Sequence, residues 1–223
     1  ALDGVTAQLP AGAWSCVVGV SGSGKSTLAT LLLRGRDPDA GVVRVGGAEL
    51  RGIPLEELRR RVALVSQRPT LLAGSIAENL RLARPGAPDD ALHEALAVAG
   101  LEDWVAGLPR GLDTPVRERG VSVSGGQLQR LALARALVAA PEVLVLDEAL
   151  SQLDAETARR VRERLLAYRT GLTVIEITHR ADLVPDDATV LVLDAGRLVA
   201  SGTAGELRAA DGPFTHLEAR VTP

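Results

Sequence analysis

Short apolar runs alternate along the chain with longer stretches in which apolar residues recur every three or four positions. The short runs have the length of buried strands, and they cover residues 14–20, 62–66, 143–146, 173–177 and 190–193. The longer stretches predict helices over 24–34 and over most of 75–137. Strands that alternate with helices are typical of an α/β fold with a mainly parallel sheet. The pattern therefore predicts such a sheet, with a helical block inserted into it.

Glycine and proline divide these stretches further. The apolar run 42–45 precedes Gly46 and Gly47, which predicts part of a β-hairpin. Two clusters of proline and glycine, at 84–88 and 108–111, predict breaks within the helical block.

Composition removes several classes of protein. The chain has 223 residues, of which 46% are hydrophobic and 24% charged, and this balance is typical of a globular domain. Its net charge of -3 gives no argument for binding nucleic acid. The single cysteine, Cys16, lies in an apolar run, so we expect a buried thiol and no internal disulfide. No apolar run reaches about 18 residues, so we expect any membrane anchor to come from another segment or chain.

Residues 19–26 read GVSGSGKS and match the phosphate-binding pattern G-x-x-x-x-G-K-[ST]. In this pattern the glycines turn backbone N–H groups toward phosphate oxygens, and the lysine reaches the β- and γ-phosphates. A predicted strand precedes the motif and a predicted helix follows it, as the motif requires. The residues expected to hold a nucleotide are Gly19, Ser21, Gly22, Ser23, Gly24, Lys25, Ser26 and Thr27.

A second motif is the apolar strand at 143–146, which ends in Asp147 and Glu148. Alternation along a strand would point these two carboxylates in opposite directions. Asp147 could then hold Mg²⁺, while Glu148 faces the attacking water as a general base. Strands often end in acids, so this motif depends on the phosphate loop upstream for its weight.

A third motif, SGGQ at 124–127, opens a strongly helical stretch. Ser124 is suited to cap that helix, and Gly125 and Gly126 would leave its N-terminus open to a second phosphate. Taken alone, an ordinary capped helix is the commoner explanation of such a segment.

The three motifs, in this order, resemble the ABC transporter nucleotide-binding domain. Three further positions agree with that family: Gln67 resembles its Q-loop glutamine, Asp154 ends a segment that resembles its D-loop, and His179 resembles its switch histidine. The resemblance implies a P-loop NTPase (RecA-like) core with an antiparallel β-subdomain and an inserted α-helical subdomain. It covers the whole chain as one domain, with the core at 1–70 and 139–223 and the helical subdomain at about 71–138. It also implies that the chain begins after the aromatic residue that stacks on adenine, and so is truncated at its N-terminus.

For mechanism, the resemblance implies two such domains, packed head to tail around two ATP molecules. Each ATP would touch the phosphate loop of one domain and the SGGQ segment of the other. That segment consists of Ser124, Gly125, Gly126 and Gln127. Asp154 would also contact the nucleotide. The catalytic residues would be Glu148, His179, Lys25 and Gln67, and the Mg²⁺ ligands would be Ser26, Gln67 and Asp147. The second domain could be identical or different.

Two segments favour an exporter within this family. Residues 114–120, TPVRERG, resemble the exporter X-loop, although Arg117 stands where that loop usually has glycine, and residues 75–80 are also exporter-like. We therefore expect a transmembrane-domain partner that lies near Arg117 and Glu118, no nucleic-acid partner, and a place at the cytoplasmic face of a cell membrane, such as the bacterial inner membrane. A non-transport ABC ATPase acting on nucleic acid or ribosomes is the alternative. A catalytically dead regulatory domain is disfavoured by the intact Lys25, Glu148 and His179.

Overall fold

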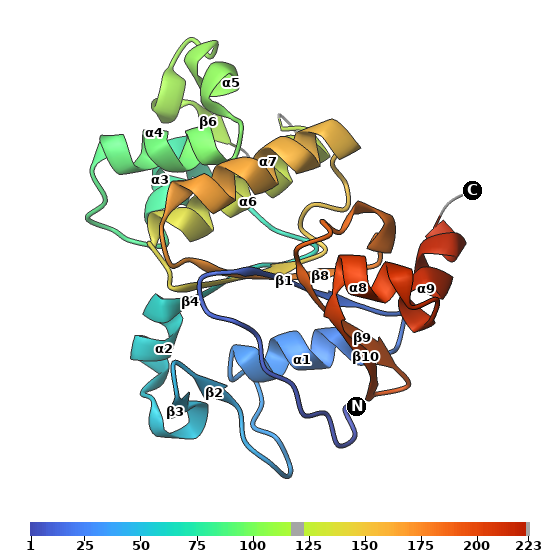
Figure 1. Cartoon of the computed structure of the whole chain (residues 1–223). Helices are drawn as coiled ribbons and strands as arrows, with labels where there is room; N and C mark the ends of the chain where they lie inside the picture. Colours follow the sequence, from blue (N-terminus) through green and yellow to red (C-terminus); the bar gives the residue numbers. More distant parts are fainter. Residues whose placement is uncertain (117–122, 222–223) are drawn as a thin grey trace.

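The computed structural model describes residues 1–116 and 123–221. Its centre is a six-stranded sheet with helices on both faces (Figure 1). The strands are β1 (Trp14–Val18), β4 (Val62–Val65), β7 (Val143–Asp147), β8 (Thr173–Thr178), β9 (Thr189–Asp194) and β10 (Arg197–Thr203). Their order across the sheet is β10-β9-β1-β8-β7-β4, and every neighbouring pair is parallel except β9 with β10. The predicted α/β fold is confirmed.

Both faces of the sheet are buried, which is why its strands are almost wholly apolar. On one face, Cys16 and Val174 belong to a cluster that includes the apolar residues of α6 (Gly125–Val138) and α7 (Ala155–Tyr168). On the other face, Val17 and Ile175 pack with α1 (Lys25–Leu32) and α2 (Leu55–Arg61). The two helix pairs lie on opposite sides of the sheet (Figure 1). Cys16 is fully buried and unpaired, as predicted.

The predicted hairpin forms between β2 (Arg44–Val45) and β3 (Ala48–Glu49), joined by Gly46 and Gly47. Both glycines have positive φ, as a tight hairpin turn requires. The expected antiparallel β-subdomain is therefore represented here by two short strands, followed by the 3₁₀ turn η1 (Leu50–Gly52).

The helical block is more broken than the sequence predicts. It contains α3 (Ile76–Arg81), α4 (Asp89–Val98), α5 (Glu102–Ala106), the 3₁₀ turn η2 (Gly111–Asp113) and α6. A short antiparallel pair, β5 (Gly74–Ser75) with β6 (Pro115–Val116), closes its base. The breaks predicted at 84–88 and 108–111 are confirmed, because the gaps after α3 and α5 contain Pro85 and Pro109. The helical prediction is wrong at 99–101, between α4 and α5, and at 115–116, where β6 forms.

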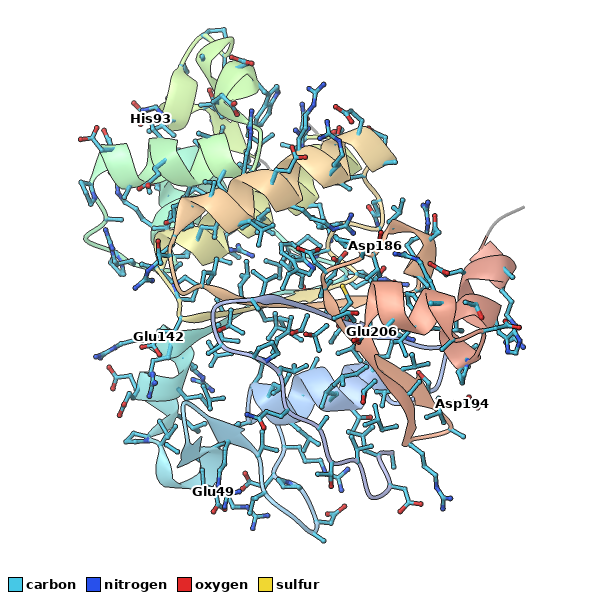
Figure 2. All side chains as sticks on the ribbon, viewed as in Figure 1. Glu49, His93, Glu142, Asp186, Asp194 and Glu206 are labelled. Carbon is cyan, nitrogen blue, oxygen red and sulfur yellow. The ribbon has the colours of Figure 1, made fainter. Side chains whose placement is uncertain are left out.

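The C-terminal part adds elements that the apolar pattern did not predict. These are α7, η3 (Ala181–Leu183), β10, α8 (Ala204–Ala209) and α9 (Pro213–Val221). Charged side chains are spread over the outside, and His93 lies on the outer surface of α4 (Figure 2). Among the residues described, no helix is long and apolar enough to cross a membrane.

Candidate functional site

The phosphate loop connects the buried strand β1 to helix α1. The strand ends at Val18, two residues earlier than predicted, because the carbonyls of Gly19 and Val20 turn toward the ammonium group of Lys25. Gly19 passes so close to β9 that a Cβ there would lie 2.2 Å from the Leu193 carbonyl oxygen. Gly24 stands before α1 with φ 107°, in the left-handed region that glycine tolerates best. The loop therefore needs glycine at both positions.

The N-terminus of α1 has no side-chain cap. Within the described residues, five backbone N–H groups of the loop and of the first turn of α1 have no protein acceptor. They belong to Gly22, Gly24, Lys25, Ser26 and Thr27. A helix N-terminus with unpaired N–H groups attracts anions, because the donors and the helix dipole act together. This end of α1 is thus suited to receive phosphate oxygens.

Lys25 supplies a positive charge at the same place. Its Nζ donates to the carbonyl oxygens of Gly19 at 2.6 Å and Val20 at 2.9 Å, and only 8% of the residue is exposed. Burial lowers the pKa of Lys25, and the carboxylates of Glu148 and Asp147 partly oppose that shift. The loop carbonyls thus hold the ammonium beside the open end of the helix.

The two acidic residues at the end of β7 differ in backbone conformation. Asp147 is the last residue of the strand, whereas Glu148 lies beyond it with φ 51°. A non-glycine residue in this region costs about 1–3 kcal/mol, so its surroundings must hold it there. The Glu148 N–H donates to the Ile177 carbonyl at 2.8 Å, and its carbonyl accepts from the Ser151 hydroxyl at 2.7 Å. A fixed turn therefore aims the Glu148 side chain.

The Glu148 carboxylate lies between two predicted site residues. Oε2 accepts a hydrogen bond from Nε2 of Gln67 at 2.5 Å, and Oε1 lies 3.4 Å from Nδ1 of His179. Gln67 follows β4 and His179 follows β8, so the sheet order brings these chain ends to the same edge as β7. Burial raises the pKa of Asp147, Glu148 raises it further, and Lys25 partly opposes the shift. The structure thus groups Gln67, Glu148 and His179, with Asp147 and Lys25 close by.

The SGGQ segment forms the N-terminus of α6, which begins at Gly125. Ser124 caps it as predicted: its hydroxyl accepts from the Gln127 N–H at 3.2 Å, and the Gln127 side chain accepts from the Ser124 N–H at 2.9 Å. The Gly125 and Gly126 N–H groups have no acceptor within the described residues. This helix end is therefore capped at Gln127, while its two glycine N–H groups remain available.

Asp154 lies beside the SGGQ segment, not beside the phosphate loop. It caps α7 by accepting from the Thr157 N–H at 2.9 Å, and this hydrogen bond lowers its pKa. Its neighbours Gln152 and Leu153 lie against Gly125 and Gly126. Across the described residues, no hydrogen bond or ion pair joins Ser124, Gln127 or Asp154 to Lys25 or Glu148. The predicted site residues thus fall into two groups that no recorded hydrogen bond or ion pair joins directly within the described part of the chain.

Gly196 is a supporting residue that sequence reasoning missed. Its N–H donates to the Ser23 carbonyl at 3.0 Å, and its own carbonyl accepts from the Asp3 N–H at 2.8 Å. The turn between β9 and β10 therefore braces the phosphate loop and the N-terminal segment. Ala195 and Gly196 between two apolar runs were the available signal for this hairpin.

Oxygen donors suited to Mg²⁺ are present among the predicted ligands. Ser26 offers a hydroxyl, Gln67 an amide carbonyl and Asp147 a carboxylate, which are the hard ligand types that this ion prefers. Over the described ranges, no group of three or more His, Cys, Asp or Glu side chains forms a metal cluster of its own. This donor set therefore suits an ion that arrives with a nucleotide, since Mg²⁺ is often bound by few protein groups and by substrate phosphates.

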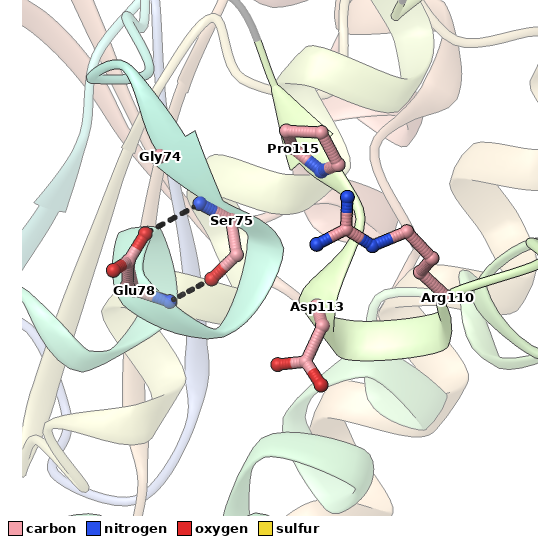
Figure 3. Close-up of a pocket in the computed structure, with 6 residues that line it drawn as sticks. All are labelled: Gly74, Ser75, Glu78, Arg110, Asp113 and Pro115. Carbon is pink, nitrogen blue, oxygen red and sulfur yellow. Dashed lines mark hydrogen bonds between the residues drawn. The ribbon is translucent and has the colours of Figure 1, made fainter.

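A separate hollow of about 530 Å³ lies in the helical block (Figure 3). Its lining residues are Gly74, Ser75, Glu78, Arg110, Asp113 and Pro115. Ser75 and Glu78 form a capping box at the start of α3, so they are held in place. Arg117 and Glu118, expected to face a transmembrane partner, lie outside the described residues.

Comparison with known proteins gives consistent matches. Residues 2–151 match the family model described as "ABC transporter". The chain is 43% identical over 218 residues to an ATP-dependent lipid A-core flippase of Photobacterium profundum, covering 97% of the chain and 37% of that protein. It is 42% identical over 201 residues to a beta-(1-->2)glucan export ATP-binding/permease protein of Nitrobacter winogradskyi, covering 90% and 33%.

A solved structure agrees with these sequence matches. The structure of a bacterial Atm1-family ABC exporter with ATP bound superposes with a TM-score of 0.94 at 37% identity. The match covers all of this chain and 39% of that one. Across these relatives, the chain spans about a third of the matched protein's length.

Proposed function

The chain belongs to the ABC transporter family, and from that premise we propose that it is the ATP-binding and ATP-hydrolysing domain of an ABC exporter. One observation carries the proposal. The unpaired N–H groups and Lys25 form an anion site, and Glu148 lies at the same edge of the sheet, held by Gln67. A phosphate site beside a positioned carboxylate is the arrangement that phosphoryl transfer to water requires.

In the proposed binding step, the loop N–H groups donate to the β- and γ-phosphate oxygens. Lys25 exchanges the Gly19 and Val20 carbonyls for phosphate oxygens, so its charge is compensated by the ligand. Mg²⁺ bound with the nucleotide would neutralise charge that develops on the phosphates. Ser26, Gln67 and Asp147 are the residues that would hold it.

In the proposed chemical step, Glu148 accepts a proton from the water that attacks the γ-phosphorus. Water oxygen forms the new bond to phosphorus, and the bond to the bridging oxygen breaks, which releases ADP and phosphate. His179, 3.4 Å from the Glu148 carboxylate, orients that group and can donate to the γ-phosphate. Gln67 holds the other carboxylate oxygen and so helps to fix the position of the base.

The separation of the two groups of site residues supports a head-to-tail dimer. Within one chain, the phosphate loop belongs to one group of site residues, and the SGGQ segment with Asp154 belongs to the other. In this proposal, one chain does not bring both groups to the same nucleotide. Pairing two chains in opposite directions would place Ser124, Gly125 and Gly126 of one against the γ-phosphate on the other. The two unpaired glycine N–H groups would then gain acceptors.

The exporter assignment extends the relatives' names to this chain. The matched proteins are a flippase, a glucan export protein and an Atm1-family exporter. In this proposal a transmembrane domain docks on the helical block, over the hollow in Figure 3 and the exposed Leu72 and Leu82 nearby in sequence. The domain would then act at the cytoplasmic face of the membrane.

The test is steady-state hydrolysis of Mg-ATP by the wild type and by Glu148→Gln. The variant keeps the shape of the side chain and removes the proton acceptor, so turnover should fall by about 10²–10⁴-fold. Glu163→Gln, an exposed carboxylate on α7, is the matched control and should hydrolyse ATP at the wild-type rate. Wild-type turnover in Glu148→Gln would remove that residue from the role of base, and no turnover in the wild type would contradict the proposed activity.

A further inference from the structure

A buried polar cluster lies between the sheet and α7, outside the site described above. It consists of Trp14 and Cys16 on β1, Glu176 on β8 and Arg162 on α7. Glu176 is 2% exposed and Arg162 is 8% exposed, so both charges are removed from water. Apolar side chains surround the cluster on this face, among them Val18 and Val174. Two charges placed in such a core require an explanation.

The cluster is fully hydrogen-bonded around the Glu176 carboxylate. Arg162 donates to both oxygens, from Nη2 to Oε1 at 2.8 Å and from Nε to Oε2 at 3.2 Å. Nε1 of Trp14 donates to Oε2 at 3.1 Å, and the Arg162 guanidinium lies 6.0 Å from the centre of the Trp14 ring. A planar guanidinium bound in this way fixes both distance and orientation, which a single apolar contact does not.

Stability alone does not explain the Arg162–Glu176 ion pair. A buried ion pair is often no more stabilising than apolar residues of similar volume, because desolvation offsets the attraction. What such a pair supplies is a defined register between the elements that carry it. Here those elements are helix α7 and strands β1 and β8. The two strands are neighbours in the sheet, with Cys16 opposite Glu176.

Each of these elements leads to a different part of the proposed site. Strand β1 runs into the phosphate loop, and β8 runs into His179 three residues after Glu176. Asp154 caps the N-terminus of α7 and precedes Arg162 by eight residues. Eight residues span about 12 Å along a helix. The carbonyl of Ile177, next to Glu176, also holds the strained Glu148 backbone. The cluster therefore joins three elements that lead to both groups of site residues.

We propose that Arg162 and Glu176 are positioning residues, which lock α7 against β8 and β1 so that Asp154, His179 and Glu148 keep their relative places during ATP hydrolysis. This inference rests on the proposed ATPase function for its kinetic consequence. Its structural consequence, that loss of the pair loosens the segments around Glu148, His179 and Asp154, does not depend on that function.

The test uses Arg162→Met/Glu176→Gln, which removes both charges and keeps an acceptor for Trp14. The matched control is Arg159→Gln/Glu163→Gln, which removes an exposed pair from the same helix. Hydrogen–deuterium exchange should be faster in the first variant over 148–157 and 177–181, and unchanged in the control. Turnover should fall about tenfold or more, since small misplacements of reacting groups are costly. Affinity for a fluorescent ATP analogue should stay within about twofold, because the phosphate loop is intact.

Arg162→Lys keeps the positive charge but loses the planar guanidinium that donates to both Glu176 oxygens. This variant tests the proposal if the double variant does not fold. Its turnover should fall several-fold at unchanged nucleotide affinity, with faster exchange over the same two segments. Wild-type exchange over both segments, in whichever of the two variants folds, overturns the proposal. If the wild type hydrolyses ATP, full turnover in either variant also overturns the proposal. If the wild type does not hydrolyse ATP, the exchange result alone decides.

Discussion

Helices α1 and α6 both follow a segment rich in serine and glycine, yet their N-termini differ. At α1 there is no side-chain cap, and Lys25 stands beside the unpaired N–H groups of the first turn. At α6, Ser124 and Gln127 satisfy each other in a capping box, and the described segment 123–127 carries no charged side chain. The first end can therefore bind an anion by itself. Among the described residues, the second has two free N–H groups, and the nearby Arg130 donates to the carbonyls of Gly126 and Gly100. It is therefore suited to contact a phosphate that another site already holds.

The largest effect that would sharpen this contrast is loss of the charge at α1. Lys25→Ala removes a charge-assisted hydrogen bond to phosphate, worth about 1.5–3 kcal/mol, so ATP affinity should fall about 10- to 150-fold. Equilibrium binding of a fluorescent ATP analogue is the measurement. Arg36→Ala, an exposed cation shortly after α1, is the control and should bind normally. Near-normal affinity in Lys25→Ala would remove the distinction between the two helix ends.

A smaller effect is expected from the cap at α6. Ser124→Ala removes the acceptor of the Gln127 N–H, which should lower the free energy of unfolding by about 1 kcal/mol. For a chain of this size, the thermal midpoint should fall by about 2–4 °C. Ser21→Ala, in the loop before α1, should leave the midpoint unchanged, because no hydrogen bond is recorded for that side chain among the described residues. Equal midpoints for the two variants would show that α6 is no better capped than α1.

The smallest effect concerns Asp147 and its pH dependence. Burial raises the pKa of Asp147, so its charged form costs the folded state stability. This cost is absent below the ordinary aspartate pKa, grows as the pH rises from there and is complete above the raised pKa. Asp147→Asn mimics the protonated carboxyl. It should therefore melt slightly higher than the wild type near neutral pH, and the difference should vanish as the pH falls below the ordinary aspartate range. The same variant should lose turnover. A wild type that gains stability over Asp147→Asn with rising pH would reverse the sign and contradict the account.

Much of the fold follows from the apolar pattern, because parallel strands buried on both faces are apolar throughout. Strands β1, β4, β7, β8 and β9 were predicted within two residues at each end. The pattern did not predict β10 or α7. β10 alternates exposed and half-buried positions over most of its length at the edge of the sheet, and α7 carries arginines and glutamates on its exposed side, so neither forms an apolar run.

The site was predictable as residue types and not as geometry. The sequence indicated Lys25, Gln67, Glu148 and His179 through motif and family resemblance, and the structure brings the last three together. Two features depend on contacts between distant segments: the left-handed Glu148 turn and the brace from Gly196. Local sequence carries little information about such contacts. The separation of the two groups of site residues is of the same kind.

The central claim is that the α1 end binds nucleotide within one chain, whereas the α6 end acts only on the nucleotide of a partner. Light scattering after size exclusion measures it directly, on Glu148→Gln at millimolar Mg-ATP. The account predicts a dimer with ATP, a monomer with ADP or without nucleotide, and a monomer with ATP when Ser124→Arg is added. Ser124→Ala in the same background loses the same cap without the bulk and should still dimerise. A Glu148→Gln chain that binds ATP and stays monomeric, or a Ser124→Arg chain that still dimerises, would contradict the claim.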